Sequence, residues 1–402
     1  MSDGNRPGLI PLDAALAALL AQIEPLSGTE TLATADARGR VLAADVVSPV
    51  DVPPADNSAM DGYALRAADL AALLPVTQRI PAGSVPAPLL AGEAARIFTG
   101  AQVPPGADTV VMQEFTELVD GRVRVTQPVT AGANVRLRGE DVRAGSVVLP
   151  TGTRLDAVSL GLAATAGAAQ LTVTRRPRVA VFSTGDELVM PGEPLPQGAI
   201  YNSNRFTLRA LLDGLGCEVI DLGIVPDKLD ATRAALRDAA SRADVILTSG
   251  GVSVGEEDHL RPAVQAEGRL DLWAIAIKPG KPFAYGRVGG AHFIGLPGNP
   301  VSSLVTFLVL VRPALLKLQG ATRLAPRGYR IAAGFDWPRP DKRREFLRVR
   351  LDDEGGLALF TNQSSGVLTS AFWADGLLDN PPGQAIKAGD AVRFIPFAEL
   401  LA

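Results

Sequence analysis

The sequence predicts a multidomain protein that combines one α/β domain, built on a parallel sheet, with several small β-rich modules. The chain has 402 residues, enough for about two to four domains at roughly 100–200 residues each. Its 41 glycines and 31 prolines favour many turns and small modules over one helical bundle. Between residues 176 and 325, apolar strand-like segments alternate with amphipathic helix-like segments, which is typical of βαβ units.

The first half of the chain changes character twice. Apolar residues recur at helical spacing from Ile10 to Ile23, which predicts a helix. Residues from about 51 to 140 consist of short strand-like segments separated by turns, which indicates a β-rich module. We therefore expect residues 1–50 and 142–175 to form one discontinuous domain, with residues 51–141 inserted between its two parts.

The second half contains the α/β domain, residues 176–325, and a final module, residues 326–402. The strands of the α/β domain are apolar throughout, so its parallel sheet should be covered by helices on both faces as a three-layer domain. The apolar run 301–318 contains Arg312, Pro313 and Lys317, so it is interpreted as a buried helix rather than a membrane span. Residues 326–402 have short strands and many turns, which favours a small closed β-barrel.

Composition excludes several classes of function. The chain has 39 Lys and Arg against 43 Asp and Glu, a net charge of −4, and lacks the basic footprint of a nucleic-acid binder. One cysteine, Cys217, excludes an internal disulfide, and two histidines disfavour a zinc site or a Ser-His-Asp triad. A bound metal would need carboxylates, which favours Mg²⁺. The N-terminus lacks a basic region, so we expect a cytoplasmic protein without a signal peptide.

Three segments of the α/β domain end in loops rich in glycine and polar residues: FSTGDE at 182–187, TSGGVSVG at 248–255 and IGLPGNP at 294–300. Loops at the carboxyl ends of parallel strands form the ligand site of such sheets. Free N–H groups in glycine-rich loops also bind oxyanions. The alternative is that each loop is an ordinary turn or helix cap, but three of them on one sheet favour a site.

Further polar segments lie outside these loops. The turn Lys278-Pro-Gly-Lys281-Pro presents two ammonium groups on a stiff backbone, which suits a phosphate or an inorganic oxyanion, although a solvated turn explains it too. The carboxylates Glu187 and Asp258 suit Mg²⁺, but each alone could be a surface or capping residue. The loops PADNSAMDGYA at 54–64 and RLRGED at 136–141 resemble loop-borne sites, or Asx turns.

Eight motifs together carry a family resemblance. They are PADNSAMDGYA, RIFTGAQVPPGADTVVMQE, RGED, FSTGDEL, YNSNRFTLRALL, DVILTSGGVSVGEEDHL, IKPGKPFAYG and GLPGNPVSS, in this order. The chain resembles the molybdopterin molybdenumtransferase family, which includes bacterial MoeA and the gephyrin E domain. The resemblance runs from about residue 8 to the C-terminus.

The resemblance implies an enzyme of molybdenum cofactor biosynthesis. Such an enzyme inserts molybdenum from molybdate into adenylylated molybdopterin, with release of AMP and a requirement for Mg²⁺. It also implies an elongated discontinuous first domain, an inserted β-rich domain, a molybdopterin-binding-like α/β domain and a C-terminal barrel. The family forms homodimers whose active cleft joins the α/β domain of one chain to the inserted domain of the other. Further implied partners are the molybdopterin adenylyltransferase and downstream cofactor-processing proteins, and neither nucleic acid nor a membrane is expected.

The resemblance also implies roles for single residues. Catalytic roles fall on four carboxylates: Asp61, Asp141, Glu187 and Asp258. Asp258 and Glu187 would also hold the metal. Binding of the pterin and of molybdate falls on a larger set: Thr99, Ser253, Lys278, Lys281, Pro297, Pro300, Arg348 and Ser365.

Two departures from the family pattern concern the anion site. Ala274 follows Trp273 where relatives commonly carry a basic residue, so one expected anion contact is absent. The segment NQSSG has Asn362 and Ser364 where His and Gly are frequent.

Three alternatives remain at the level of sequence. A molybdopterin-binding scaffold without catalysis is disfavoured because the chain carries no fused adenylylating domain or long linker. Adenylylation by the third domain alone is disfavoured by the DNSAMDGYA and RGED loops and by the last domain. A tungsten-inserting enzyme stays open, because molybdate and tungstate have nearly equal size and charge.

Overall fold

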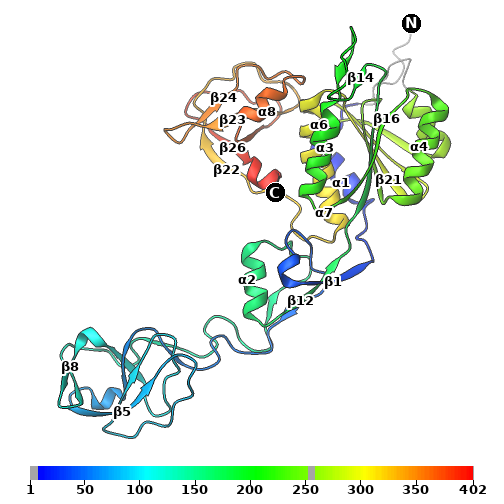
Figure 1. Cartoon of the computed structure of the whole chain (residues 1–402). Coiled ribbons are helices and arrows are strands. Elements are labelled where there is room, and N and C mark those ends of the chain that lie inside the picture. The colour runs from blue at the N-terminus through cyan, green and yellow to red at the C-terminus, as the bar shows by residue number, and fades with distance from the viewer. Residues whose placement is uncertain (1–7, 252–258, 402) are drawn as a thin grey trace.

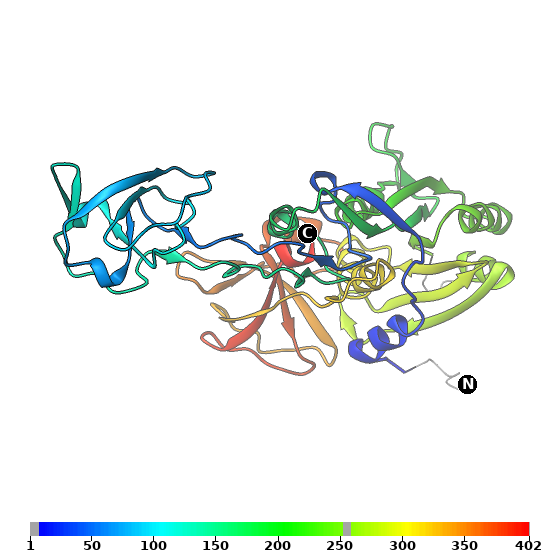
Figure 2. The ribbon, with the colours of Figure 1, turned by 90° about the horizontal axis from the view of Figure 1, so that it is seen from below.

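The computed structural model describes residues 8–251 and 259–401. The molecule is elongated: the inserted domain forms one end, and the α/β and C-terminal domains lie together at the other (Figure 1). Two extended stretches of chain join these ends, with a small domain between them (Figure 2). The predicted class, multidomain α/β plus β with a β-rich insertion, is confirmed. The numerical domain boundaries remain predictions.

The inserted domain is built on a six-stranded sheet of order β7-β4-β6-β5-β9-β8. Its strands are β4 (Gly62–Leu65), β5 (Leu74–Ile80), β6 (Ala94–Ile97), β7 (Thr109–Met112), β8 (Thr116–Val119) and β9 (Arg122–Val125). A separate pair joins β3 (Asn57–Ser58) to β10 (Val135–Arg136), and the short helices η2 (Ala67–Asp69) and η3 (Gln113–Phe115) lie in the connections. Successive residues of β4 enter two different apolar clusters, Ala64 one and Tyr63 the other, so both faces of the sheet are covered.

The small middle domain is discontinuous in sequence. Strand β1 (Thr29–Ala33) pairs antiparallel with β12 (Gln170–Thr174), and β2 (Val46–Val47) pairs with β11 (Val147–Leu149). Helix η1 (Thr34–Asp36) follows β1, and α2 (Ala157–Thr165) packs over the strands. Helix α2 begins where the Asp156 side chain accepts a hydrogen bond from the Ser159 amide, as expected for an N-cap. The apolar cluster of this domain draws residues from both parts of the chain.

Helix α1 (Leu12–Leu20), which the sequence predicts, packs on the α/β domain rather than on the middle domain. Leu12 and Leu19 belong to the same buried cluster as Leu315 of α7 (Arg312–Leu318). The Ile10 amide also donates to the Ala274 carbonyl at 2.7 Å. The predicted domain of residues 1–50 and 142–175 therefore includes a helix whose apolar face is buried elsewhere.

The sheet of the α/β domain has the order β16-β13-β17-β21-β20-β18. Its strands are β13 (Arg178–Thr184), β16 (Glu218–Val225), β17 (Val245–Ser249), β18 (Gly268–Ala274), β20 (Pro282–Val288) and β21 (Ala291–Leu296). The first four in sheet order are parallel, as predicted, but β20 runs antiparallel to both of its neighbours, β21 and β18, so the sheet is mixed. The reason is the two-residue Gly289-Gly290 connection between β20 and β21, which is long enough only for a hairpin.

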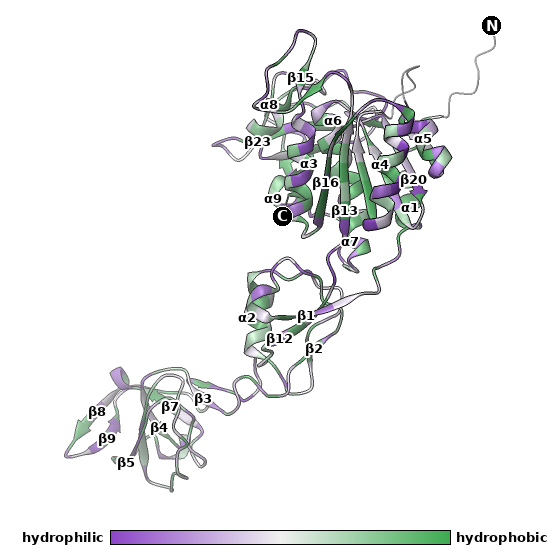
Figure 3. Cartoon of the chain, turned by 45° about the vertical axis from the view of Figure 1, so that its right-hand side comes forward, coloured by the Kyte–Doolittle hydropathy of each residue, from purple (hydrophilic) through white to green (hydrophobic). Residues whose placement is uncertain are grey.

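Helices cover both faces of this sheet, as the sequence predicts. On one face lie α3 (Ser203–Gly214), α6 (Pro300–Thr306) and α7, with α1, and on the other lie α4 (Leu229–Arg242) and α5 (Leu260–Glu267). The strands are apolar along most of their length (Figure 3). Helices α6 and α7 continue each other through a π-helical turn, η4 (Phe307–Val311). By length and composition the combined helix Pro300–Leu318 could cross a membrane, but 89% of its apolar window is buried in the protein.

The C-terminal domain consists of β22 (Tyr329–Ala332), β23 (Arg344–Leu351), β24 (Leu357–Leu359), β25 (Gly376–Asn380) and β26 (Ala391–Pro396), with α8 (Leu368–Trp373) and α9 (Phe397–Leu400). Neighbouring strands pair in the order β24-β23-β25-β26-β22, and a bridge between Ala333 and Leu357 closes this ring. A sixth strand, β19 (Ile277–Lys278), comes from the α/β domain and pairs with β23. The two domains therefore share one sheet.

Candidate functional site

A cleft of about 400 Å³ lies at the carboxyl edge of the parallel strands. Its wall includes Glu187 after β13, Gly250 after β17 and Pro297 after β21. These residues come from the three loops that the sequence analysis singled out, so the loops do converge on one site. Pro300, at the first turn of α6, also lines the cleft. The short strands β14 (Leu188–Val189) and β15 (Ile200–Tyr201) close its outer side.

Glycine is required where two of these loops meet. Gly250 has a φ of +90°, and a Cβ there would stand 3.0 Å from the Thr184 carbonyl oxygen. Gly251 has a φ of +65°, and a Cβ would meet the Thr184 hydroxyl at 2.9 Å. Only glycine adopts this backbone freely at such close approach. The predicted residues Ser253 and Asp258 follow directly in sequence but lie outside the described residues.

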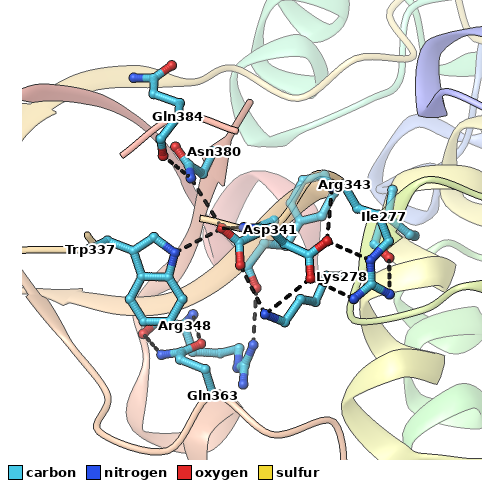
Figure 4. Close-up of polar contacts among 11 residues, drawn as sticks. Ile277, Lys278, Trp337, Asp341, Arg343, Arg348, Gln363, Asn380 and Gln384 are labelled. Carbon is cyan, nitrogen blue, oxygen red and sulfur yellow. Dashed lines mark hydrogen bonds and ion pairs between the residues drawn. The ribbon is translucent and has the colours of Figure 1, made fainter. Parts of the chain in front are cut away.

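The KPGKP turn lies against helix α6. Gly280 has a φ of +113°, and a Cβ there would stand 2.4 Å from the Thr306 hydroxyl. Lys278 lies on β19, opposite Glu345 of β23. Its ammonium group is 3.2 Å from Glu345 Oε1 and 3.5 Å from Asp341 Oδ2. The structure therefore places Lys278 in an ion-pair network with the C-terminal domain (Figure 4).

Glu345 is the centre of this network. Its side chain has 0% exposure, and its second carboxylate oxygen accepts from Trp337 Nε1 at 2.8 Å and from the Asp341 amide at 3.1 Å. A fully buried carboxylate needs such partners to offset its lost hydration. Asp341 in turn receives two hydrogen bonds from the Arg343 guanidinium, which hold the pKa of Asp341 well below its usual range. Sequence reasoning missed Asp341 and Glu345. The segment Arg344-Glu345-Phe346 looks like part of an ordinary strand, and nothing in it indicates a partner from another domain.

Lys281 differs from Lys278 in its surroundings. Its side chain is exposed and forms no ion pair within the described part of the chain. Its carbonyl accepts the Ile275 amide at 2.8 Å, which fixes the backbone of the turn. Ala274, the position where relatives carry a basic residue, lies opposite Pro282 in the β18–β20 pair. A cation at that position would therefore stand beside the turn.

Arg348 and Ser365 belong to the C-terminal domain and face the same region. Arg348 is 1% exposed, and burial lowers its pKa to about 10. Its guanidinium donates to neutral oxygens of Phe346, Ser364 and Ser370. The Ser365 carbonyl accepts the Val301 amide at 2.9 Å, so the NQSS loop touches the N-terminal turn of α6.

In the inserted domain, the structure joins two predicted residues directly. The Thr99 amide and the Thr99 hydroxyl both donate to Asp61 Oδ1 at 2.7 Å. These hydrogen bonds lower the pKa of Asp61, with a smaller contribution from the charge of Arg96. Asp141 lies in a loop that folds onto the chain before the domain, with its amide donating to the Val52 carbonyl. All three residues are exposed.

The predicted site residues thus fall into two groups. Glu187, Pro297, Pro300, Lys278, Lys281, Arg348 and Ser365 gather around the α/β and C-terminal domains. Asp61, Thr99 and Asp141 belong to the inserted domain and its entry, toward the opposite end of the chain (Figures 1 and 2). One chain does not bring the two groups together.

The chemistry of the cleft fits a hard cation. Glu187, Thr184 and Ser249 supply oxygen ligands at its wall, which Mg²⁺ prefers. Among the described residues no three His, Cys, Asp or Glu side chains are grouped as a metal cage.

The chain combines a mixed α/β sheet and its loop-lined cleft with an inserted β-rich domain and a terminal barrel. This is the domain composition of a molybdenum cofactor biosynthesis protein, as the family models show. Three family models match in succession: the MoeA N-terminal region (domains I and II) over residues 10–167, a probable molybdopterin-binding domain over 180–317, and the MoeA C-terminal region (domain IV) over 330–397.

Relatives match along nearly the whole chain. A protein from Haemophilus influenzae named molybdopterin molybdenumtransferase is 42% identical, covering 98% of this chain and 100% of the relative. A protein of the same name from Nostoc is 40% identical, covering 93% and 90%. The solved structure of a molybdopterin biosynthesis MoeA protein from Pyrococcus horikoshii superimposes with a TM-score of 0.82 at 30% identity, covering 97% and 100%. The chain therefore belongs to the molybdopterin molybdenumtransferase (MoeA) family.

Proposed function

We propose that this protein is a molybdopterin molybdenumtransferase of molybdenum cofactor biosynthesis. It takes molybdenum from molybdate, inserts it into adenylylated molybdopterin and releases AMP. The observation that carries this proposal is the assembly of one cleft from three strand-end loops, beside a turn that presents Lys278 and Lys281. The name of the relatives, molybdopterin molybdenumtransferase, supports a transfer of molybdenum to molybdopterin.

Capture of molybdate needs positive charge, because molybdate is a tetrahedral oxyanion. Lys281 provides an exposed ammonium group that has no ion pair within the described residues. Arg348 provides a buried guanidinium that donates only to neutral oxygens there. Lys278 carries two carboxylate partners, so it contributes less net charge. An oxyanion bound among these groups forms charge-assisted hydrogen bonds, which are stronger than neutral ones.

Insertion requires the dithiolene sulfurs of the pterin to replace oxide on molybdenum, and the oxide leaves as water after taking up protons. Carboxylates near the reacting groups move these protons. Glu187 lies in the wall of the cleft. The two hydrogen bonds from Thr99 lower the pKa of Asp61, so its side chain is a carboxylate at neutral pH. The sulfur belongs to the substrate, since burial raises the pKa of the only cysteine, Cys217, to about 12.

Magnesium would be held by Glu187 together with Asp258, a position outside the described residues. When bound, Mg²⁺ stabilises negative charge on the phosphoanhydride and on the leaving AMP. The protein itself orients the adenylylated substrate in the cleft and keeps its carboxylates within reach of it.

The active unit in this proposal is a homodimer, in which the inserted domain of one chain covers the cleft of its partner. Support comes from the positions of the inserted domain and the α/β domain toward opposite ends of one chain (Figure 1). Two-fold symmetry then generates two equal sites per dimer. The enzyme works in the cytoplasm, where it would receive its substrate from a molybdopterin adenylyltransferase and pass its product to cofactor-processing proteins.

The test is incubation of the full-length protein with adenylylated molybdopterin, Mg²⁺ and either molybdate or tungstate. Release of AMP together with active cofactor is expected with molybdate. Cofactor formed only with tungstate would identify a tungsten-inserting enzyme. Tight binding of the pterin without AMP release under any condition would identify a scaffold and contradict the proposal.

A further inference from the structure

Two arginines of the inserted domain lie side by side on one aromatic ring. Arg79 of β5 and Arg96 of β6 are direct partners in the parallel pairing of these strands. Each guanidinium carbon is 4.6 Å from the centre of the Phe98 ring. Phe98 follows Arg96 by two residues, which places both side chains on the same face of an extended chain.

The positive charges of this pair are not neutralised by any ion pair in the described ranges 8–251 and 259–401. Arg96 donates to the Gly62 carbonyl at 2.9 Å and to Gln113 Oε1 at 2.7 Å, both neutral acceptors. Arg79 is exposed. Like charges directly opposite each other across two strands are unfavourable, and the Phe98 ring offsets this only in part. An arriving anion would remove the repulsion.

The arginine pair adjoins the Asp61–Thr99 hydrogen bonds. Thr99 follows Phe98 in sequence, and Gly62, whose carbonyl Arg96 holds, follows Asp61. The Gln113 amide donates to the Asp61 carbonyl at 3.0 Å, so Arg96 is hydrogen-bonded to two residues that adjoin Asp61, Gly62 and Gln113. Asp61 is ionised and by itself repels an anionic substrate. Two cations next to it allow such a substrate to approach.

We propose that Arg79, Phe98 and Arg96 form a phosphate-binding site that receives the adenylyl phosphate of the substrate and of the AMP product. The inference rests on the proposed function and adds one point to it, which is the class of ligand that the inserted domain binds. Guanidinium groups match phosphate oxygens bidentately. Molybdate is the other oxyanion available, but the proposed function assigns it to the lysine turn and Arg348, which lie in other domains.

The experiment measures binding of AMP to the full-length protein by calorimetry, with adenosine and molybdate as comparison ligands. The variants are Arg79→Gln and the double variant Arg79→Gln/Arg96→Gln. The matched control is Arg122→Gln, an exposed arginine of β9 in the same domain. We expect AMP affinity to fall about tenfold in the single variant and further in the double variant. Binding of adenosine and molybdate, and the control variant, should stay at wild-type level.

Kinetics separate this inference from the proposed function. In the double variant the KM for adenylylated molybdopterin should rise while the KM for molybdate does not. If the wild type forms cofactor but the double variant keeps its AMP affinity and KM, the arginine site is wrong and the function stands. If the wild type binds AMP through the arginines but forms no cofactor, the proposed function fails alone.

Loss of fold is controlled by a second variant. Arg96→Gln removes two hydrogen bonds to backbone and side chain, so its thermal unfolding is compared with wild type. Arg79→Glu touches an exposed residue and reverses one charge, so it should weaken AMP binding more than Arg79→Gln does. Equal AMP affinity in wild type and Arg79→Glu, equal losses of AMP and molybdate binding, or no AMP binding by the wild type would overturn the proposal.

Discussion

The cleft of the α/β domain and the Asp61 region of the inserted domain are built in different ways. The cleft is lined by three loops that follow β13, β17 and β21, so the parallel sheet itself brings its wall together. The Asp61 region is an exposed surface that carries one carboxylate, one threonine and two arginines. Asp61 is hydrogen-bonded to Thr99, and the two arginines are partners on neighbouring strands. The first region is a concave site, whereas the second is an exposed surface that would cover such a site in the proposed dimer.

The proposed homodimer accounts for this difference: in it, the two regions are parts of one site that a single chain leaves apart. Figures 1 and 2 place the inserted domain away from the α/β domain in both views. Glu187 and Asp61 are separated accordingly, although both are carboxylates suited to the same proton chemistry. The following predictions test whether the regions meet only between chains, and how differently they respond.

The largest expected effect is recovery of activity by mixing two inactive variants. Asp61→Asn damages the inserted domain, and Glu187→Gln damages the cleft. Each variant alone should lose nearly all turnover, because each removes the charge of a proposed catalytic carboxylate. After subunit exchange, each mixed dimer has one intact and one doubly damaged site. Activity should then reach about a quarter of wild type, since random mixing makes about half the dimers mixed.

Exchange is checked by mass spectrometry of chains that carry different mass labels. The control is a mixture of two separately prepared samples of Asp61→Asn, which cannot form an intact site. If exchange is complete and activity stays at the level of the single variants, both regions act within one chain, and the shared-cleft arrangement is wrong.

The two lysines of the KPGKP turn should separate stability from anion binding. Lys278→Ala leaves the buried Glu345 carboxylate without its cation, which should cost about 1–3 kcal/mol of unfolding free energy. Lys281→Ala removes an exposed group and should leave stability within about 0.5 kcal/mol. Both should raise the molybdate concentration needed for half-maximal turnover. Denaturant unfolding and molybdate titration measure the two effects.

Lys278→Met is a useful companion variant, because it keeps the length of the side chain without the charge. If Lys278→Ala and Lys281→Ala were equally stable, the ion pairs to Asp341 and Glu345 would contribute nothing to folding. If the molybdate requirement stayed at wild-type level in both, the turn would bind another anion.

Acid should weaken the α/β domain through His292. This residue is 5% exposed, and burial, with the charge of Arg287, lowers its pKa from 6.5 to about 4. Below pH 6.5 the unfolded state takes up a proton that the folded state refuses, so stability falls as the pH drops toward 4. The loss is at most about 3 kcal/mol. The inserted domain contains no histidine, so the difference between the two regions should grow in this range.

His292→Gln should flatten the pH dependence of unfolding between pH 6.5 and 4. His259→Gln, at the N-cap of α5 and only half-buried, is the matched control. A pH profile that is the same in His292→Gln and wild type would show that other groups govern the acid response.

The smallest expected effect concerns Cys217. Burial raises the pKa of its thiol to about 12, so almost no thiolate is present at pH 8. Iodoacetamide should therefore leave the native protein unmodified and fully active over an hour. In denaturant the same thiol should react, which makes it a probe of the opening of the α/β domain. Rapid labelling of the native state would place Cys217 at the surface.

Much of the fold follows from local sequence patterns. The α/β domain, its three loops and the terminal barrel were predictable because alternating apolar periods and glycine turns are local signals. The antiparallel direction of β20 was missed, although the Gly289-Gly290 connection between β20 and β21 carries the signal for a hairpin. The packing of α1 on α7 could not be predicted, since the apolar face of a helix does not indicate which other element it packs against.

For the site, residue types were predictable but not their partners. The sequence analysis selected Asp61 and Thr99, and the structure joins them by two hydrogen bonds. It also paired Lys278 with Lys281 as two equivalent cations, whereas within the described residues Lys278 forms ion pairs with Glu345 and Asp341 and Lys281 does not. Such contacts join residues more than sixty positions apart, and no local pattern encodes them. The roles of all these residues remain predictions.

The sheet shared by two domains has a consequence for how the protein opens. Ile277 and Lys278 pair with β23, and the Arg344 amide donates to the Ala276 carbonyl at 2.9 Å. Any fluctuation that unravels the C-terminal barrel must therefore release this stretch of the neighbouring domain too. The lysine turn belongs, in thermodynamic terms, to the same cooperative unit as the barrel. A destabilising substitution anywhere in the last seventy or so residues would therefore also affect the lysine turn, without changing any residue that lines the cleft.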